Sequence, residues 1–454
     1  MLKILQTASR EVASRLELVL LLALVIAVPG SAATPTLQTL YNFTDLGDGG
    51  FPQAGLVLSS SGALYGTTAD GAMGWGSIFE LTPGTGGTWT FSTLYTFTGG
   101  ADGAMPLADL AIGANNVLYG TTYYGGTYGY GTVFQLSNSG NSWTEKVLYS
   151  FQNGADGANP QSGVTVASNG VLYGNTYNGG TSNMGTIYEL IPVKGGGWNE
   201  KVLYAFKGNT DGANPVSDMV LGSGGSLFGT TYQGGSVTIT NQPPTCTTTS
   251  PCTYSNWGTV FELTPKGGGT WVESLLYTFL GGSDGGSPQS ALIIGKNNVL
   301  YGSASSGGTP TVCPLGGYPL GCGVVFQVAP PAKGTTTWTE SVLYTFTGVS
   351  PDGVHPNGNM ALNSSGALLG TTTAGGIVTD VCYPESYPGC GTIFEIKPPA
   401  TKGGSWTKSN IMTFNGINGG APNGVILGNG GTLYGTTYVG GDSTGAGTVF
   451  LMTP

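Results

Sequence analysis

Arginine is almost missing from this sequence, because Arg10 and Arg15 are the only two and both lie within the first 33 residues. The remaining chain contains 10 Lys against 21 Asp and Glu, which gives a net charge near −11. Nucleic acids are bound by clustered cations that replace counterions and by the bidentate contacts of arginine. The composition therefore excludes nucleic acid as a partner and also disfavours an anionic membrane surface.

Histidine is equally scarce, since His355 is the only one and no Cys-x-x-Cys motif occurs. A metal site built from these ligands is therefore not expected, and His355 is predicted to be an exposed loop residue. Cysteine is limited to six residues in three local pairs. In an oxidising compartment such pairing predicts three short-loop disulfides. They would join Cys246 to Cys252, Cys313 to Cys322 and Cys382 to Cys390.

Long apolar runs are missing apart from one near the N-terminus, the 11 residues 18–28. Lys3, Arg10 and Arg15 precede this run, and the small residues Ser31-Ala32-Ala33 follow it. This layout predicts a signal peptide over residues 1–33 and a mature protein over 34–454 that is secreted, periplasmic or displayed at the cell surface. An uncleaved anchor is the alternative, although a membrane span needs about 20 apolar residues.

Glycine is abundant instead, with 82 residues, and a five-residue motif recurs along the chain. The motif is Leu64-Tyr65-Gly66-Thr67-Thr68, and its copies are separated by 54, 54, 55, 73, 68 and 65 residues. Self-similarity at a fixed period is the mark of a repeat architecture. The later copies begin at Leu118, Leu172, Leu227, Leu300, Leu368 and Leu433.

One unit contains four segments with the period-two alternation of β-strands, over residues 55–58, 63–68, 77–82 and 89–97. Seven such units predict an all-β, seven-bladed propeller of four-stranded antiparallel blades. A solenoid would use shorter repeats. Tryptophans that open the fourth strands are predicted to pack between blades. They are Trp143, Trp198, Trp271, Trp338 and Trp406.

The two ends of the chain predict how the ring closes. Residues 447–451 resemble a third strand that lacks its fourth, and residues 37–43 resemble a fourth strand that has no preceding unit. Pairing of these two strands would form blade seven from residues 423–454 together with 36–43. It would also remove an exposed sheet edge.

The units also resemble a known family. Gly131-Thr132-Val133-Phe134, Trp143 to Phe151, Asp156-Gly157-Ala158-Asn159-Pro160 and Leu172-Tyr173-Gly174 are similar to the GloVer tandem repeat of exported bacterial proteins. The resemblance covers nearly all of residues 37–454. It implies export and often surface attachment, and it implies no particular chemistry.

The loops on one face of the predicted ring carry the remaining signals. The three cysteine pairs lie in the loops between the second and third strands of blades four, five and six, where they would form one raised rim. An Asp-Gly-x-x-Pro sequence recurs between blades, as at Asp102 and Asp156, and predicts a turn in which Asp accepts backbone N–H bonds. The alternative is that these carboxylates are ligands of a calcium ion.

Residues that break the repeat are the candidate binding residues. At the start of the innermost strand most units have a small residue or Asn, as at Gly55, Gly163, Ala291 and Asn359, whereas two units have Asp109 and Asp218 instead. Asp109, Asp218 and the polar Asn359 are the candidates at this position. The two Asp are predicted at the channel mouth on alternate blades, where they could bind a cation or act as a carboxylate pair. Aromatic side chains in the loops of the same face could stack on sugar rings. They are Trp75, Trp257, Tyr123, Tyr124, Tyr128 and Tyr130.

These features favour a non-catalytic, monomeric module that binds a glycan or a protein and needs no cofactor. Two alternatives remain open: a secreted glycan hydrolase or lyase that uses the channel-mouth carboxylates, and a structural protein of the cell envelope. No Ser/His/Asp set, P-loop or dinucleotide fingerprint occurs, and no catalytic residue is assigned.

Overall fold

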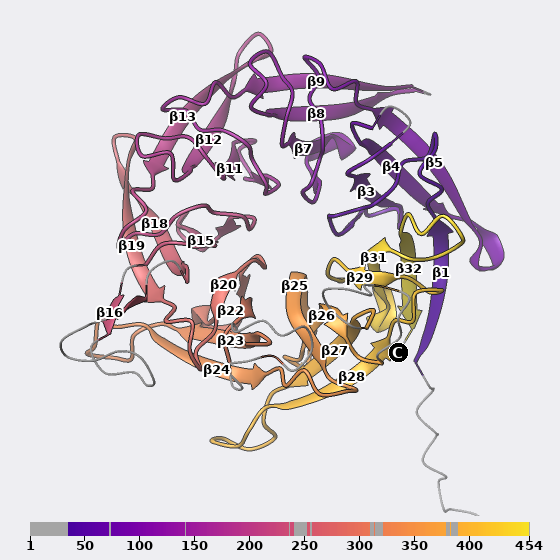
Figure 1. Cartoon of the computed structure of the whole chain (residues 1–454). Coiled ribbons are helices and arrows are strands. Elements are labelled where there is room, and N and C mark those ends of the chain that lie inside the picture. Colours follow the sequence, from indigo (N-terminus) through magenta and orange to yellow (C-terminus); the bar gives the residue numbers. More distant parts are fainter. Residues whose placement is uncertain are drawn as a thin grey trace, which may run out of the picture. The chain divides into compact units, whose positions relative to one another are not determined.

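The computed structural model describes residues 35–453 except 72–73, 141, 236, 240–251, 255–256, 309–312, 314–320, 378–381 and 383–388. The compact unit Leu37–Thr453 is an all-β propeller, as predicted, with seven blades around a common axis (Figure 1). No helix in the described part of the chain has the length and hydropathy needed to span a bilayer. The predicted signal peptide lies outside the described residues and stays a prediction.

Blade one shows how the repeated motif builds a sheet. Its strands are β2 (Val57–Leu58), β3 (Leu64–Thr68), β4 (Ser77–Pro83) and β5 (Trp89–Thr96), paired in that order. Every residue of β3 is buried, because β3 lies inside the sheet and the faces are covered by neighbouring blades. A Cβ atom at Gly66 would lie 2.5 Å from the Phe79 ring. The glycine of the motif is therefore required by the aromatic residue opposite it on β4.

The other blades repeat this arrangement, with further short strands in blades five and seven and a separate hairpin in blade four. Single 3₁₀ turns close some hairpins at Thr85–Gly87, Ala114–Asn116, Lys296–Asn298 and Asn429–Gly431. The strands are β6 (Ala111–Ile112), β7 (Leu118–Thr122), β8 (Thr132–Ser139) and β9 (Ser142–Ser150) in blade two; β10 (Thr165–Val166), β11 (Leu172–Thr176), β12 (Thr186–Val193) and β13 (Gly197–Ala205) in blade three; β14 (Val220–Leu221), β15 (Leu227–Thr231), β18 (Thr259–Gly267) and β19 (Thr270–Thr278) in blade four, with the hairpin β16 (Val237–Ile239) and β17 (Cys252–Tyr254); β20 (Gly286–Pro288), β21 (Ile293–Ile294), β22 (Leu300–Ser306), β23 (Val324–Ala329) and β24 (Thr339–Thr345) in blade five; β25 (Gly353–Leu362), β26 (Leu368–Gly375), β27 (Thr392–Lys397) and β28 (Thr407–Thr413) in blade six; and β29 (Gly420–Pro422), β30 (Ile426–Leu427), β31 (Leu433–Val439), β32 (Thr448–Thr453) and β1 (Thr36–Asn42) in blade seven.

The ring closes as the chain ends predict. β1 is the outer neighbour of β32 in one sheet, and Figure 1 shows the indigo β1 beside the yellow β32. The Phe43 N–H donates to the Gly447 carbonyl at 3.0 Å, and the Thr444 hydroxyl donates to the Phe43 carbonyl at 2.9 Å. The first and last described strands therefore complete one blade and leave no open edge at the seam.

The blades are held together by aromatic contacts that repeat at every interface. In blades one and two, the buried Phe97 meets the buried Phe134 edge to face at 5.3 Å. Outside this pair, Trp143 packs on Tyr65 of the preceding blade at 6.1 Å, which confirms the predicted role of the repeated tryptophans. Such aromatic pairs contribute about 0.5–1.5 kcal/mol each beyond their area burial. The equivalents of the first pair are Phe43–Phe79, Phe151–Tyr188, Phe206–Phe261, Phe279–Phe326, Phe346–Phe394 and Phe414–Phe450.

The Asp-Gly-x-x-Pro loops form the predicted turns and add a contact that the sequence did not indicate. Asp102 accepts the Thr98 N–H at 2.8 Å and also the Tyr95 hydroxyl at 3.0 Å. The loop is therefore tied to the end of the preceding strand. The equivalent tyrosine–aspartate pairs are Tyr41–Asp48, Tyr149–Asp156, Tyr204–Asp211, Tyr277–Asp284 and Tyr344–Asp352.

In blades two to five, a single outer-strand position faces the tyrosine–aspartate pair of the preceding blade. In blade two this residue is Glu145, which is level with Leu136 of β8. Burial and the Asp102 carboxylate raise the pKa of Glu145 to about 7. Among the described residues, the buried Oε1 atom of Glu145 accepts no hydrogen bond. Glu200, Glu273 and Glu340 repeat this situation, and we call the four residues the interface glutamates.

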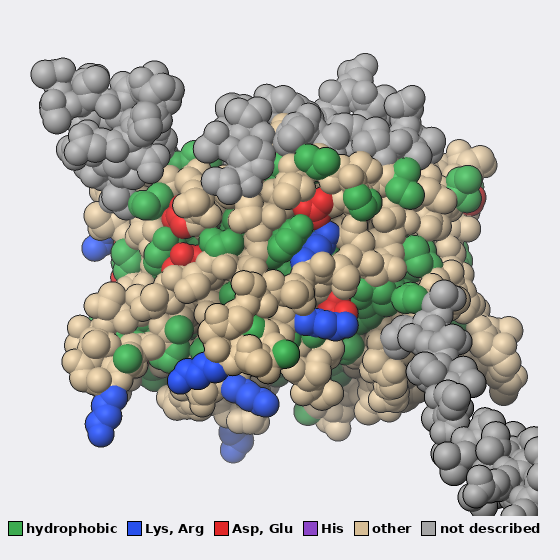
Figure 2. Space-filling model, turned by 90° about the horizontal axis from the view of Figure 1, so that it is seen from below, with side chains coloured by type: hydrophobic (Ala, Val, Ile, Leu, Met, Phe, Trp, Pro, Cys, Tyr) green, Lys and Arg blue, Asp and Glu red, His purple; other side chains and the backbone are tan. Residues whose placement is uncertain are grey.

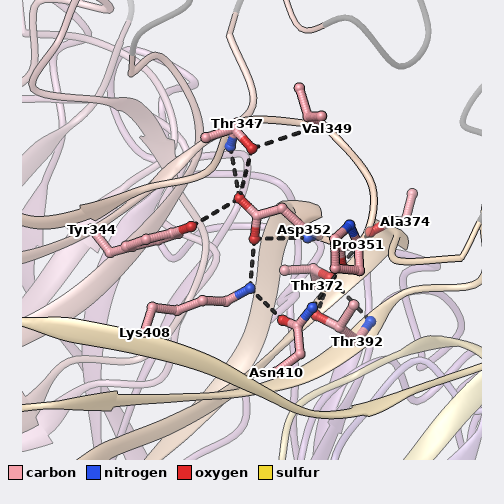
Figure 3. Close-up of polar contacts among 11 residues, drawn as sticks. Tyr344, Thr347, Val349, Pro351, Asp352, Thr372, Ala374, Thr392, Lys408 and Asn410 are labelled. Atoms are coloured by element: carbon pink, nitrogen blue, oxygen red, sulfur yellow. Dashed lines mark hydrogen bonds and ion pairs between the residues drawn. The ribbon is translucent and has the colours of Figure 1, made fainter.

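Blade six carries a cation at the same position, because Lys408 is level with Ile396 of β27. Its Nζ atom lies 2.5 Å from Oδ1 of Asp352, and the two side chains are only 6% and 9% exposed. Figure 3 shows Asp352 between Lys408, Tyr344 and Thr347, all of which point toward its carboxylate. One blade interface is thus closed by an ion pair where four others bring two carboxyl groups together.

Two of the predicted disulfides are present, Cys313–Cys322 and Cys382–Cys390. The pair Cys246 and Cys252 falls outside the residues whose side chains the structure describes. The prediction for His355 was wrong: this residue lies in β25 and is partly buried, with Nδ1 2.8 Å from the Ser305 carbonyl. Burial lowers the pKa of His355. The chain passes close to the neighbouring blade here, so a residue in a loop-like sequence is enclosed.

Candidate functional site

The innermost strands begin at the propeller axis with residues that alternate between small and polar. Strand pairing identifies the equivalent positions, because Val57, Ala361 and Ile426 pair with corresponding residues of the next strand. The residue two positions earlier is polar in blades two, four and six and small in the others. In chain order these residues are Gly55, Asp109, Gly163, Asp218, Ala291, Asn359 and Gly424.

Each polar residue of this ring accepts a backbone N–H from the preceding blade. The Gly55 N–H donates to Oδ1 of Asp109 at 2.6 Å, and the Gly163 N–H donates to Oδ1 of Asp218 at 2.7 Å. In blade six the Ala291 N–H donates to Oδ1 of Asn359 at 3.0 Å. Three inner-strand termini are therefore capped by side chains from the next blade, and unpaired N–H groups at the axis are avoided.

One contact crosses the interior of the ring. The Nδ2 amide of Asn359 donates to Oδ2 of Asp109 at 2.7 Å, although these residues belong to blades six and two. Both carboxylate oxygens of Asp109 are thus occupied by donors. The structure places the three predicted axial residues, Asp109, Asp218 and Asn359, around a single cavity.

Burial raises the pKa of both aspartates above the ordinary carboxyl value. For Asp218 the pKa rises to about 7, first through burial and then through the charge of Asp109, against the lowering effect of the Gly163 N–H. The pair consequently holds a proton near neutral pH. Like charges that share a low-dielectric site cannot both ionise without cost.

The axial cavity has a volume of about 220 Å³ and a wall rich in carboxamides. A second cavity of about 350 Å³ shares Gln53, Asn357 and Asn423 with it and extends to Ala421 and Tyr438. None of the described residues that line the two cavities is Lys, Arg or His. The carboxamides of the axial cavity come from Gln53, Gln161, Gln289, Asn357, Asn359 and Asn423.

Tyrosines follow the repeated motif in three successive blades, and of this set only Tyr123 was predicted as an aromatic of the loop face. Tyr123, Tyr177 and Tyr232 succeed each other in blades two, three and four, and all three are partly buried. Burial raises the pKa of Tyr123 and, to a lesser degree, so does the neighbouring Tyr124. A hydrogen bond with the side chain of Gln161, which lines the cavity, lowers the pKa of Tyr123 and opposes these two effects. The sequence signal for this set is that a Tyr directly follows the last Thr of the motif in each of these three blades.

The aromatic loop residues lie farther from the axis. Trp75, Tyr124 and Tyr128 are 43%, 46% and 53% exposed. Trp75 is fixed by its carbonyl, which accepts the Met105 N–H at 2.8 Å. Trp257 is partly buried and packs so closely on Gly281 that a Cβ atom there would lie 2.1 Å from the indole. The stacking role of all four aromatics stays a prediction.

No group of three or more His, Cys, Asp or Glu gathers as metal ligands in the described part of the chain. The Asp-Gly-x-x-Pro carboxylates are also engaged by tyrosine and backbone donors, as in Asp156 with Tyr149 and Gln152. A calcium ion in these loops would have to compete with those donors. The calcium hypothesis has no supporting geometry here and stays untested.

Comparison with known proteins places the chain in a repeat family. The model of the Gloeobacter/Verrucomicrobia repeat matches residues 30–241 and 245–454, which is nearly the whole sequence. The chain belongs to this repeat family. The match agrees with the resemblance seen in the repeated motifs. No curated protein matches the sequence.

Solved structures give only distant likenesses to this member of the Gloeobacter/Verrucomicrobia repeat family. A putative 6-phosphogluconolactonase from Bacteroides uniformis is 14% identical with a TM-score of 0.48, over 82% of this chain and 88% of that one. A putative oxidoreductase (glucose dehydrogenase) from Thermus thermophilus is 15% identical with a TM-score of 0.44, over 92% and 100%. A PQQ-bound aldose sugar dehydrogenase from Streptomyces coelicolor is 12% identical with a TM-score of 0.41, over 93% and 98%. These values carry no argument about function.

The axial ring predicts different outcomes for its two aspartates. Asp218→Asn should leave stability unchanged or raise it above pH 7, because Asn359 already fills the equivalent position with the same backbone contact. Asp109→Asn should lower the free energy of unfolding by about 1–2 kcal/mol, because an amide at this position cannot accept from both Gly55 and Asn359. Urea denaturation of both variants at pH 8 measures the difference, and equal effects would contradict the assignment.

Proposed function

We propose that this propeller is a non-catalytic binding module for a neutral glycan, which enters the axial cavity with a terminal sugar. The proposal depends on one observation: the wall of the cavity combines many carboxamides and two carboxyl groups and no cation among its described residues. Carboxamides and carboxyl groups donate to and accept from hydroxyl groups, whereas an anionic ligand would be repelled by Asp109 and Asp218.

The size and surroundings of the cavity support a sugar. Small-molecule sites typically enclose about 300–1,000 Å³, and the second cavity, which shares lining residues with the axial one, reaches this range. Tyr438 lines the second cavity and Tyr123 contacts the cavity residue Gln161, and such aromatic rings suit the apolar faces of sugars. The exposed Trp75, Tyr124 and Tyr128 extend an aromatic surface on the same face for further sugar units.

Binding to a panel of neutral oligosaccharides, measured by calorimetry, tests the proposal. We expect Gln161→Leu to weaken binding at least tenfold, since a partly buried carboxamide that hydrogen-bonds a hydroxyl is lost. Gln152→Leu is the matched control, because Gln152 is exposed and is absent from the cavity wall. Absence of binding across the panel, or equal losses in both variants, would reject the axial site.

The alternative of a glycan hydrolase or lyase has one observation in its favour, the raised pKa of Asp218 beside Asp109. Acid–base catalysis uses such pairs with separated pKa values. Against it, both oxygens of Asp109 are held by Gly55 and Asn359. The variant Asp218→Asn separates the two functions: a binding module keeps its affinity, whereas a hydrolase loses the release of reducing ends from its substrate.

A further inference from the structure

The face of the propeller opposite the axial cavity carries lysine and no acidic residue. We call it the turn face, because it consists of the turns between the first and second and between the third and fourth strands of each blade. None of these turns contains Asp or Glu. Figure 2 shows lysine side chains that project from one edge of the propeller without acidic side chains beside them. The lysines of the turn face are Lys194, Lys266, Lys296, Lys333 and Lys402, and all are exposed.

The acidic residues lie elsewhere. The Asp-Gly-x-x-Pro aspartates and the axial Asp109 and Asp218 belong to the opposite face, and the glutamates in the described part of the chain lie along the strands. A strand such as β8, with 8 residues, separates the two faces by roughly 25 Å. This distance is about three times the Debye length of ~8 Å at physiological salt. The aspartates of the opposite face therefore do not cancel the field of the turn face.

The lysines form a two-dimensional array. Lys296 lies in the inner turn of blade five, whereas Lys194, Lys333 and Lys402 lie in the outer turns of blades three, five and six, and Lys266 lies at the end of β18 beside the outer turn of blade four. None of the ion pairs among the described residues involves any of the five. Lysine is a point charge on a flexible stem and does not impose the geometry of an arginine fork. Lysines spread over two dimensions of one face match a flat, negatively charged surface better than a linear polyanion.

We propose that the turn face docks on a lipid bilayer with anionic headgroups and thereby holds the axial cavity away from the membrane. The contact is electrostatic and peripheral. Each lysine near an anionic bilayer surface contributes about a fivefold increase in the partition coefficient. Five lysines acting together therefore raise binding about a hundredfold or more over a variant that lacks them.

Sedimentation of the mature protein with vesicles tests this proposal. We expect binding to vesicles that contain phosphatidylglycerol, little binding to vesicles of phosphatidylcholine alone, and a loss of binding at high salt. Substitution of all five turn-face lysines by Gln should abolish it. Lys207→Gln is the matched control, because Lys207 is an exposed lysine in a loop of the opposite face. Circular dichroism and the melting temperature confirm that the variants are folded.

Several outcomes would overturn the proposal. Equal binding to neutral and anionic vesicles would show that charge is not the cause. A fivefold or larger loss with Lys207→Gln would place the contact on the opposite face. Retention on heparin without binding to anionic vesicles would assign the lysine array to a linear polyanion.

Discussion

Replacement of Asp352 by Asn is expected to lower the free energy of unfolding by about 3–5 kcal/mol, the usual cost of leaving one partner of a buried ion pair alone. Lys408 is 6% exposed and lies over the rings of Tyr344 and Phe346. Burial already lowers the pKa of Lys408, and the Asp352 carboxylate opposes that effect. Without the carboxylate the lysine would have to lose its proton or leave the interface. Urea denaturation at pH 7, followed by fluorescence, measures the change.

The opposite substitution should cost much less. Lys408→Phe leaves Asp352 with donors from Tyr344 and Thr347. The chain already contains this arrangement at another interface, where Phe91 stacks on Tyr41 at 3.9 Å beside Asp48. Lys201→Met is the control for a partly exposed pair, since Lys201 is 41% exposed beside Glu189, and about 0–1 kcal/mol is expected there. Equal losses for Asp352→Asn and Lys408→Phe would contradict this account.

The fold could be predicted from the sequence because the repeat carries its own long-range information. The motif at Leu64–Thr68 predicts the second strand of each unit, which the structure shows as a buried strand inside the sheet. The incomplete units at the two ends predict ring closure, since each end supplies what the other lacks. Insertions did not disturb this prediction, because they lengthen loops and leave strand pairing unchanged.

The site could be predicted only in part. Asp109 and Asp218 were identified because they interrupt a position where the other units have a small residue or Asn359. Their contacts could not be predicted, since Asn359 and Asp109 are 250 residues apart and meet only if the ring has the right diameter. Tyr177 and Tyr232 were missed because each directly follows the repeated motif and has the same sequence surroundings as ordinary strand residues.

The interface glutamates were missed for a different reason. In the sequence Glu145 is an alternating polar residue on an outer strand, which predicts exposure to solvent. The loop with Asp102 folds over it from the preceding blade, and the buried Oε1 atom is left without a donor among the described residues. A pattern within one repeat cannot show what the neighbouring repeat covers. For the same reason, the sequence alone did not show why blade six has Lys408 where four other blades have Glu.

Replacement of the four interface glutamates by Gln is expected to stabilise the protein at pH 8. The pKa of each glutamate is raised to about 7 by burial and by the aspartate of the preceding blade. A carboxyl group with a raised pKa binds more protons in the folded state than in the unfolded state. Its penalty is therefore absent below about pH 4.5, grows as the pH rises toward 7 and then stays constant. Partial exposure reduces this penalty to about 1 kcal/mol per glutamate, so about 4 kcal/mol is expected in total.

Denaturant unfolding of the native chain between pH 5 and pH 8 should thus show falling stability, and the fourfold variant should show a flatter profile. Glu262→Gln is the control, because Glu262 lies on β18, outside these interfaces. A second variant, Glu273→Lys, tests the same physics with the opposite charge. The buried Oδ1 of Asp211 has no hydrogen-bond partner among the described residues, and a lysine at position 273 would meet it as Lys408 meets Asp352. If both variants leave the pH profile unchanged, the carboxyl groups at the blade interfaces are not electrostatically coupled.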